Sequence, residues 1–368
     1  MGRLNGDVKR FVDREACRRW FARAILWFYR GRTCEGPAIS IAEVLENPRK
    51  ILIIPDLRAG GLFLGAPKFR AIRNRYPRAE ISLLTDARRE YVAREMPFID
   101  DVILCNDLLL PVGTKLRDLV GRLQRREFDV ALCFGAPDCL LPGYLCYKSG
   151  AQLRVGFHAA EIPFFNFRII PRKEPCYEAD RLSLLLRTLD IAEGDMRLGW
   201  SISPEGAGKI LERYLGERRN EERLVGIDTS SGIGPPLSFR QWQGVVQAVD
   251  ENCRAIIFFD FDQRRVANRL KEMLGPRALL FQTDDLPRTV ALMEACEGFV
   301  AGNTDLFHLS VTLGLPTVGL VPEHDVPRWV PSDCPWVRVV ARTGRGEGMG
   351  GRVVGMLAEM QNSAFQKR

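Results

Sequence analysis

The sequence predicts an α/β protein made of two Rossmann-like halves that follow a basic N-terminal arm. Short apolar runs, typical of buried parallel strands, alternate with helical patterns along most of the chain. They form two series, joined by a stretch with three prolines over residues 170–205. A chain of 368 residues, with 46% hydrophobic and 27% charged residues, is long enough for two globular domains. We therefore expect an arm and linker over residues 1–48, an N-terminal domain over 49–200 and a C-terminal domain over 201–368.

The arm is expected to be helical, and it carries most of the net charge. Residues 1–32 contain nine Lys or Arg and three acidic residues, which accounts for +6 of the total +7. Its aromatic residues lie beside arginines, a combination that suits an anionic membrane surface. Docking on the protein's own body or on a partner subunit is the alternative. Because nearly all of the excess positive charge lies in the arm and only +1 remains for the rest of the chain, we expect no nucleic-acid partner.

Other features of composition exclude several classes of protein. No apolar run reaches the roughly 18 residues of a membrane span, and the N-terminus lacks a signal-peptide pattern. The ten cysteines are scattered without C-x-x-C spacing, so we expect reduced thiols rather than disulfides or zinc ligands. We expect a cytoplasmic protein without cofactor or metal, attached peripherally to the inner face of the cytoplasmic membrane if the arm binds lipid.

The N-terminal half begins with a strand, a Gly-Gly loop and a helix. Apolar runs at 50–55, 80–85, 101–105 and 129–134 are its expected strands, with helical patterns at 65–76 and 115–126. Gly60 and Gly61 allow a close backbone approach to a ligand, and they open the first helix. Neither can transfer a proton, and the nearest acid in this loop is Asp56.

The C-terminal half contains a second strand–loop–helix unit with polar residues. Its expected strands lie at 223–229, 254–262, 278–283, 298–301 and 316–321. Gly302, Asn303, Thr304 and Asp305 follow the fourth of these and precede a helix that bears His308. Either Asn303 or Thr304 can cap this helix, whose free N–H groups would bind an anion.

Two further stretches of this half carry polar groups. The loop Thr229–Gly232 offers hydroxyl and N–H groups to a phosphate. Asp260 and Asp262 form a D-x-D at a strand end, which is compatible with a metal site or a phosphatase and equally with helix capping.

The stretch "FVAGNTDLFHLSVTLGLPTVGL" resembles the signature of glycosyltransferase family 9, the ADP-heptose:lipopolysaccharide heptosyltransferases. That signature reads N-D-T-G-x-x-H-L-A-x-x-L-G-x-P after a strand. The matching residues are Thr304, His308, Leu309, Leu313, Gly314 and Pro316. The stretches "ILIIPDLRAGGLFLGAPKFRAIRNRYPRAEISLLT", "YEADRLSLLLRTLDI" and "VPRWVP" are similar to further segments of the family, in the same order.

The resemblance implies a GT-B type architecture with a ligand cleft between the two halves. It implies metal-independent, inverting transfer of a heptose-like sugar from a nucleoside-diphosphate donor, such as ADP-heptose, to a lipopolysaccharide core or related glycolipid. With this resemblance in view, we expect a donor and phosphate site at Thr229, Ser230, Ser231, Gly232, Asp262, Gly302, Asn303, Thr304 and Asp305, and an acceptor-side loop at Gly60 and Gly61. The expected catalytic residues are His308, which matches the family signature, and Asp56, which is the nearest acid in the Gly-Gly loop.

Three departures from the family concern its chemistry. Gly60 and Gly61 stand where the family has Gly-Asp, whose Asp is thought to be the catalytic base. Pro235 lies near the position of a phosphate-binding Lys, and Asn303 replaces an Asp. A transferase would therefore need Asp56 or Asp305 as base, or an acceptor that is already nucleophilic. The alternative is a non-catalytic relative that binds a nucleotide sugar or serves as a scaffold.

Overall fold

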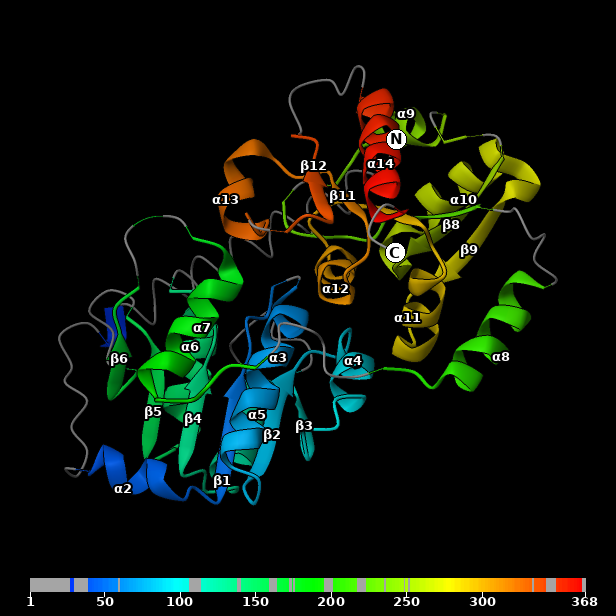
Figure 1. Cartoon of the computed structure of the whole chain (residues 1–368). Helices are drawn as coiled ribbons and strands as arrows, with labels where there is room; N and C mark the ends of the chain where they lie inside the picture. The colour runs from blue at the N-terminus through cyan, green and yellow to red at the C-terminus, as the bar shows by residue number, and fades with distance from the viewer. Residues whose placement is uncertain are drawn as a thin grey trace. The chain divides into compact units, whose positions relative to one another are not determined.

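The structure is a computed structural model, and its elements are traced in Figure 1. It describes residues 27–29, 39–58, 60–105, 114–137, 140–158, 164–171, 174, 176–194, 201–216, 223–234, 236–247, 249–250, 252–332, 334–341 and 349–365. The chain divides into two compact units. The first consists of residues 1–57, 68–172 and 182–193, and the second of residues 58–67, 173–181 and 194–368.

A parallel six-stranded sheet forms the centre of the first unit. Its strands are β1 (Lys50–Ile54), β2 (Glu80–Thr85), β3 (Asp101–Leu104), β4 (Val130–Cys133), β5 (Leu153–Phe157) and β6 (Phe167–Ile169). They lie in the order β3-β2-β1-β4-β5-β6, which is the strand order of dinucleotide-binding Rossmann sheets. The connection reverses direction between β1 and β4, so the loop after β1 lies at the topological switch point.

Helices separate these strands, as the alternating pattern predicted. They are α2 (Ile41–Glu46), α3 (Gly61–Arg75), α4 (Glu90–Arg94), α5 (Thr114–Gln124), α6 (Leu140–Lys148) and α7 (Glu178–Thr188). Apolar side chains of α5 and α6 form one buried cluster with a face of the sheet, around Leu52, Ile54 and Ala131. The beginnings of α3 and α7, up to Pro67 and Arg181, belong to the second unit.

The predicted arm lies outside the described residues except for a helical turn at residues 27–29. Tyr29 is buried in the core of the first unit, where its ring makes edge contacts with Tyr144, Tyr147 and Phe164. Trp27 next to it is 82% exposed. The end of the arm is therefore anchored to the protein's own body through Tyr29, while Trp27 faces solvent.

The second unit repeats the same sheet topology. Its strands are β7 (Arg223–Asp228), β8 (Cys253–Phe259), β9 (Ala278–Gln282), β10 (Gly298–Ala301), β11 (Thr317–Gly319) and β12 (Val337–Val339). They lie in the order β12-β11-β10-β7-β8-β9, and every pair is parallel. If β7 is taken as the first strand and the sheet is read from its β9 edge, this is the strand order of the first sheet. Two Rossmann-like sheets confirm the predicted α/β class, and the switch point of the second lies between β7 and β10.

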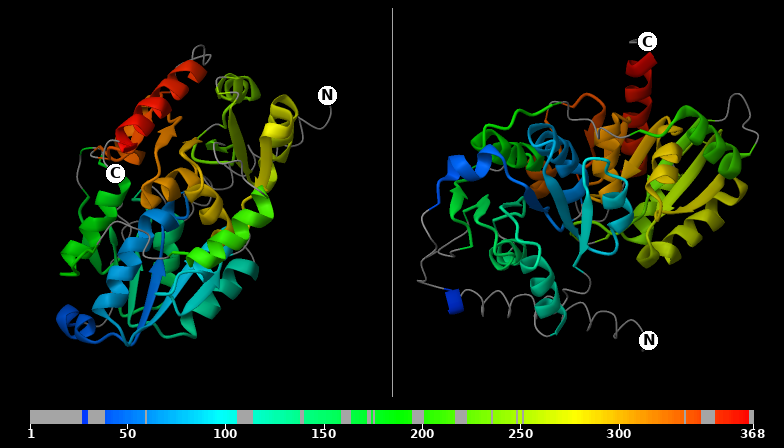
Figure 2. Two further views of the ribbon diagram at one scale, coloured as in Figure 1. Left: turned by 45° about the vertical axis from the view of Figure 1, so that its right-hand side comes forward. Right: turned by 90° about the horizontal axis from the view of Figure 1, so that it is seen from below.

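The helices of the second unit are α8 (Pro204–Leu215), α9 (Phe239–Gln247), α10 (Arg264–Leu274), α11 (Leu286–Glu294), α12 (Asp305–Leu313), α13 (Val326–Trp329) and α14 (Met349–Phe365). One face of the sheet is buried under α9, α10 and α14 in a single apolar cluster. The C-terminal helix α14, drawn in red in Figure 2, packs along α9. On the other face, α12 packs against β10 and β11, and this contact fixes the start of α12 beside the switch point.

The described residues were also compared with the requirements of disulfides, metal sites and membrane spans. Their seven cysteines are free thiols, and six of these are buried. No cluster of three or more potential metal ligands occurs among the described residues. None of the helices in the described part is both long and apolar enough to cross a bilayer.

The tight packing at the centre of the second sheet leads to a testable prediction about Gly226. A Cβ atom on Gly226, in β7, would lie 2.4 Å from the Phe299 ring on β10. We expect Gly226→Ala to destabilise the protein by about 1–3 kcal/mol, because the ring has no space to move away. Calorimetry should show a lower melting temperature. Gly208→Ala, in exposed space on α8, is the matched control and should raise the melting temperature slightly.

Candidate functional site

The candidate site of the second unit is formed by two loops that meet at the switch point of its sheet. Residues 229–234 follow β7, and residues 302–304 follow β10, its neighbour in the sheet. The two loops are joined by a hydrogen bond that the Ile233 N–H donates to the Asn303 carbonyl oxygen over 2.8 Å. Gly232 lies so close to this carbonyl that a Cβ atom would be 2.1 Å from it. Two segments 70 residues apart in the sequence therefore form one continuous surface.

A buried carboxylate, which we did not identify from the sequence, holds this junction. Asp228, the last residue of β7, is fully buried and accepts a hydrogen bond from the Thr304 hydroxyl at 2.5 Å. It also accepts from the Ser230 N–H at 2.9 Å. Burial raises the pKa of Asp228 to about 6, against the opposing effect of the hydrogen bonds from Ser230 and Thr304. The signal in the sequence was an acid at the end of an otherwise apolar strand.

The loop predicted to bind phosphate uses several of its donors within the protein. The Thr229 N–H and hydroxyl both donate to the Phe258 carbonyl oxygen. The Ser231 N–H donates to the Asp260 carboxylate at 2.9 Å. A bound phosphate would therefore contact this loop through serine hydroxyls or through Gly232 rather than through all of its amides.

Thr304 is the residue that caps α12, which decides between the two caps that the sequence allowed. Its hydroxyl oxygen accepts a hydrogen bond from the Phe307 N–H at 3.1 Å. Asp305, the first helical residue, accepts a hydrogen bond from the Gly60 N–H at 2.5 Å. The helix start thus lies beside the Gly-Gly loop, with one of its first-turn N–H groups occupied by the cap.

His308 is fully buried one turn into this helix. Its Nε2 lies 3.0 Å from Asn303 Oδ1, an oxygen that can only accept, so Nε2 carries the proton. Burial lowers the pKa of His308 to about 3, which leaves the ring neutral at physiological pH. His308 Nδ1 and Asn303 Nδ2 are buried and have no hydrogen-bond partner among the described residues. A neutral, weakly basic imidazole suits orientation of a ligand better than proton abstraction.

The His308 ring lies directly against the Gly60 backbone. A Cβ atom on Gly60 would lie 2.0 Å from the imidazole ring, and the φ of Gly60 is +79°. The side chain of His308 therefore requires glycine at this position, and the expected approach of a ligand to Gly60 stays a prediction. Gly61 begins α3 as predicted.

A charged cluster beside these residues was also missed. Glu178, 3% exposed in its side chain, accepts from Arg58 Nη2 at 3.3 Å, from Arg181 Nε at 3.0 Å and from Arg328 Nε at 3.4 Å. The Arg58 and Arg328 guanidinium carbons lie 5.0 and 5.3 Å from the centre of the Trp329 ring. That ring is 5.6 Å from the His308 ring.

The remaining predicted residues are Asp56, Asp262 and Gly302, of which only Gly302 belongs to the two loops of the candidate site. Asp56 is buried in the loop after β1, at the switch point of the first unit. Asp262 is exposed in a short 3₁₀ helix, Phe261–Gln263. Asp260 caps that helix through the Gln263 N–H at 3.0 Å, in agreement with the capping alternative. Gly302 leads from β10 into the loop.

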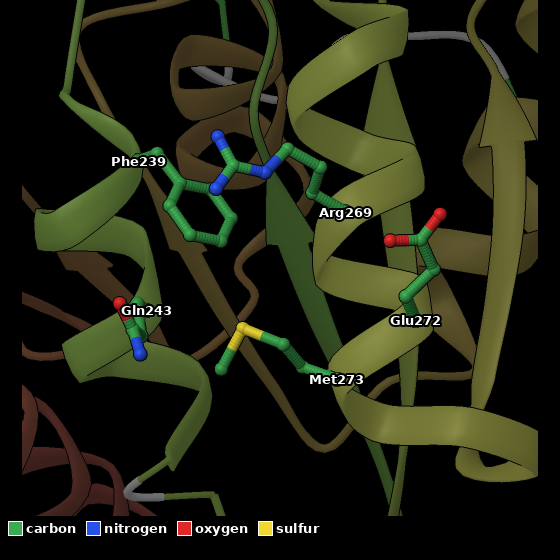
Figure 3. A pocket seen from close by; sticks show the side chains of 5 residues that line it. All are labelled: Phe239, Gln243, Arg269, Glu272 and Met273. Atoms are coloured by element: carbon green, nitrogen blue, oxygen red, sulfur yellow. The ribbon is translucent and has the colours of Figure 1, made fainter.

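Figure 3 shows a groove of the second unit between α9 and α10. Phe239, Gln243, Arg269, Glu272 and Met273 line it, and the Arg269 guanidinium lies over the Phe239 ring at 3.7 Å. None of the predicted site residues lines this groove, so it is separate from the candidate site.

The raised pKa of Asp228 predicts how stability depends on pH. The unfolded carboxyl ionises near pH 3.8 and the folded one near pH 6. Between these values only the folded state retains the proton, so stability falls by about 1.4 kcal/mol per pH unit and levels off above pH 6. Relative to Asp228→Asn, the wild-type melting temperature should fall from pH 4.5 to 6. Parallel curves for the two proteins would contradict this assignment.

Two proteins of known name are similar to the chain in sequence. A protein of Haemophilus influenzae, provisionally named a glycosyltransferase, is 23% identical over 300 residues, which cover 77% of this chain and 86% of the relative. Lipopolysaccharide heptosyltransferase 2 of Escherichia coli is 21% identical over 294 residues, covering 74% and 82%. No protein-family model matches the sequence.

Several solved structures share the fold of this chain. A glycosyl transferase of family 9 from Veillonella parvula superposes with a TM-score of 0.69 at 15% identity, over 86% of this chain and 98% of its own. ADP-heptose lipopolysaccharide heptosyltransferase II of E. coli gives 0.67 at 19% identity, over 86% and 99%. An E. coli heptosyltransferase solved with ADP gives 0.62 at 14% identity, over 85% and 98%. Both relatives and all three of these structures are named as glycosyltransferases or heptosyltransferases, which confirms the resemblance of this chain to glycosyltransferase family 9.

Proposed function

We propose that this protein transfers a heptose-like sugar from a nucleoside-diphosphate donor to a lipopolysaccharide core or related glycolipid. The observation that carries the proposal is the junction of the 229–234 and 302–304 loops at the switch point of the second sheet, where Rossmann-like sheets bind nucleotides. The E. coli neighbour solved with ADP supports a nucleotide ligand of this kind.

The donor diphosphate is placed at the start of α12. There the partial positive charge of the helix and the remaining donors of the 229–232 loop stabilise the charge that develops on the leaving group. This arrangement needs no metal ion, and the reaction inverts the anomeric centre. Within the described part of the chain, Asn303 Nδ2 and His308 Nδ1 have no hydrogen-bond partner, and this donor and acceptor match a hydroxyl group of the sugar donor.

The proton of the attacking hydroxyl requires a carboxylate, since Gly60 and Gly61 cannot accept it. Asp305 is half-buried and lies in hydrogen-bond contact with Gly60. Asp56, in the loop after β1, is the second candidate. Asp305 is the base that we favour, because its contact with Gly60 joins it to the acceptor-side loop.

The glycolipid acceptor would bring the protein to a membrane surface. The basic arm over residues 1–32 is the segment that suits such a surface, and the exposed Trp27 at its described end has the amphipathic ring found at membrane interfaces.

Donor binding is the first test of this function. Isothermal titration with ADP, UDP, GDP and dTDP should show saturable binding of one nucleotide, and the matching nucleotide sugar should be consumed in the presence of lipopolysaccharide core. Thr304→Val removes the hydroxyl that caps α12 and bonds to Asp228, and it should weaken binding at least tenfold. Failure of every nucleotide to bind the wild-type protein would contradict the proposal.

The base is identified by separating binding from turnover. Asp305→Asn should lower kcat by about 10²–10⁴-fold with little change in nucleotide affinity, because only proton transfer is removed. Asp56→Asn is the parallel variant. A larger loss of kcat in Asp56→Asn than in Asp305→Asn would move the role to Asp56.

A non-catalytic nucleotide-sugar binding protein is the second candidate function, and the glycine at the family's Asp position favours it. It predicts nucleotide binding without consumption of any nucleotide sugar and no effect of either Asp variant.

A further inference from the structure

Three sequence stretches that the proposed function leaves unused meet in one place in the second unit. Arg58 precedes the Gly-Gly loop, Glu178 and Arg181 begin α7, and Arg328 lies in α13. In the sequence, Glu178 lies 120 residues from Arg58 and 150 residues from Arg328. We infer that Arg58 and Arg328 form a binding site for a phosphate group of the substrate, organised by Glu178 and Trp329.

Glu178 is built to position these arginines. Its carboxylate is buried, and it takes its shortest contacts from Arg181 on its own helix, with Nε at 3.0 Å. Arg58 and Arg328 reach it by longer contacts of 3.3 and 3.4 Å. Arg181 therefore satisfies most of the charge of Glu178, and the same carboxylate orients the other two guanidinium groups.

Trp329 fixes the same two arginines from another side. The indole ring is buried, and both guanidinium groups lie within cation–π range of it. Two like charges held at one carboxylate and one ring repel each other, and a phosphate between them would remove that repulsion. Guanidinium groups bind phosphate oxygens through paired N–H donors, so this geometry suits a phosphate better than a single carboxylate.

The side chains of Arg58 and Arg328 are 25% and 33% exposed, against 8% for Arg181, so a ligand can reach the first two. Trp329 contacts His308, and Gly60, two residues after Arg58, bonds to the first residue of α12. The arginines are thus neighbours of the proposed donor site. This inference rests on the proposed function for the identity of the substrate, but the site itself is tested with a simple anion.

The test is isothermal titration of the full-length protein with inorganic pyrophosphate. We expect at least a tenfold weaker affinity in Arg58→Gln/Arg328→Gln than in the wild type. Arg213→Gln, an exposed change on α8, should bind as the wild type does. Arg328→Lys keeps the charge and should fold normally with an intermediate affinity. Wild-type protein that does not bind pyrophosphate, or arginine variants within twofold of it, would overturn the inference.

Two further ligands distinguish the source of the phosphate. A loss of ADP affinity in the double variant assigns the site to the donor diphosphate, and a loss of affinity for phosphorylated, deacylated lipopolysaccharide core assigns it to the acceptor. Unchanged affinity for both would overturn the site. Pyrophosphate binding that depends on the arginines, in a protein that binds no nucleotide, would support the site while contradicting the proposed function.

Discussion

The candidate site depends on one buried hydrogen bond, between the Asp228 carboxylate and the Thr304 hydroxyl. In a parallel sheet the loops after β7 and β10 emerge side by side at the switch point, but nothing in the sheet itself fixes how they pack. Asp228 fixes them, because a buried carboxylate requires hydrogen-bond donors and Thr304 supplies one of them. The same hydroxyl caps α12, so the start of that helix is held by the strand beside it.

A second layer of contacts continues from this junction. Asp305 accepts the Gly60 N–H, the ring of His308 fills the space that a Cβ atom on Gly60 would need, and Trp329 packs against that ring. Glu178 then holds the arginines beside Trp329. Negatively and positively charged groups thus have different places in the second unit. The carboxylates of Asp228 and Asp305 hold the backbone at the switch point, and the guanidinium groups lie further from it, beside Trp329. In our proposal the guanidinium groups attract a phosphate-bearing ligand, and the N–H and hydroxyl groups at the start of α12 orient it.

The sequence was sufficient for the fold and for part of the site. Apolar runs separated by helical patterns predicted both sheets, because buried parallel strands and amphipathic helices have different periods. The Gly302–Asp305 stretch was located for the same local reason, since a polar cap directly after a strand marks a helix start. Local patterns also allowed for Asp260 as a helix cap, which is its role in the structure.

What the sequence did not provide were contacts between distant residues. Asp228 lies 76 residues from Thr304, and Gly60 lies 245 residues from Asp305. From the sequence Gly60 is a residue that allows a ligand to approach, and nothing in the sequence indicated that the His308 ring also lies against it. Likewise, Glu178 and the three arginines that contact it come from three separate stretches of the sequence. Taken alone, none of these stretches differs from an ordinary charged segment. Only the folded chain shows that they share one carboxylate.

The most direct test of this account is a crystal structure of the protein with the nucleoside diphosphate that binds most tightly. The account predicts diphosphate density at the start of α12, in contact with Thr304 and the 229–232 loop. Nucleotide density at another place in the second unit, such as the groove between α9 and α10, with the α12 start occupied by protein atoms alone, would contradict it.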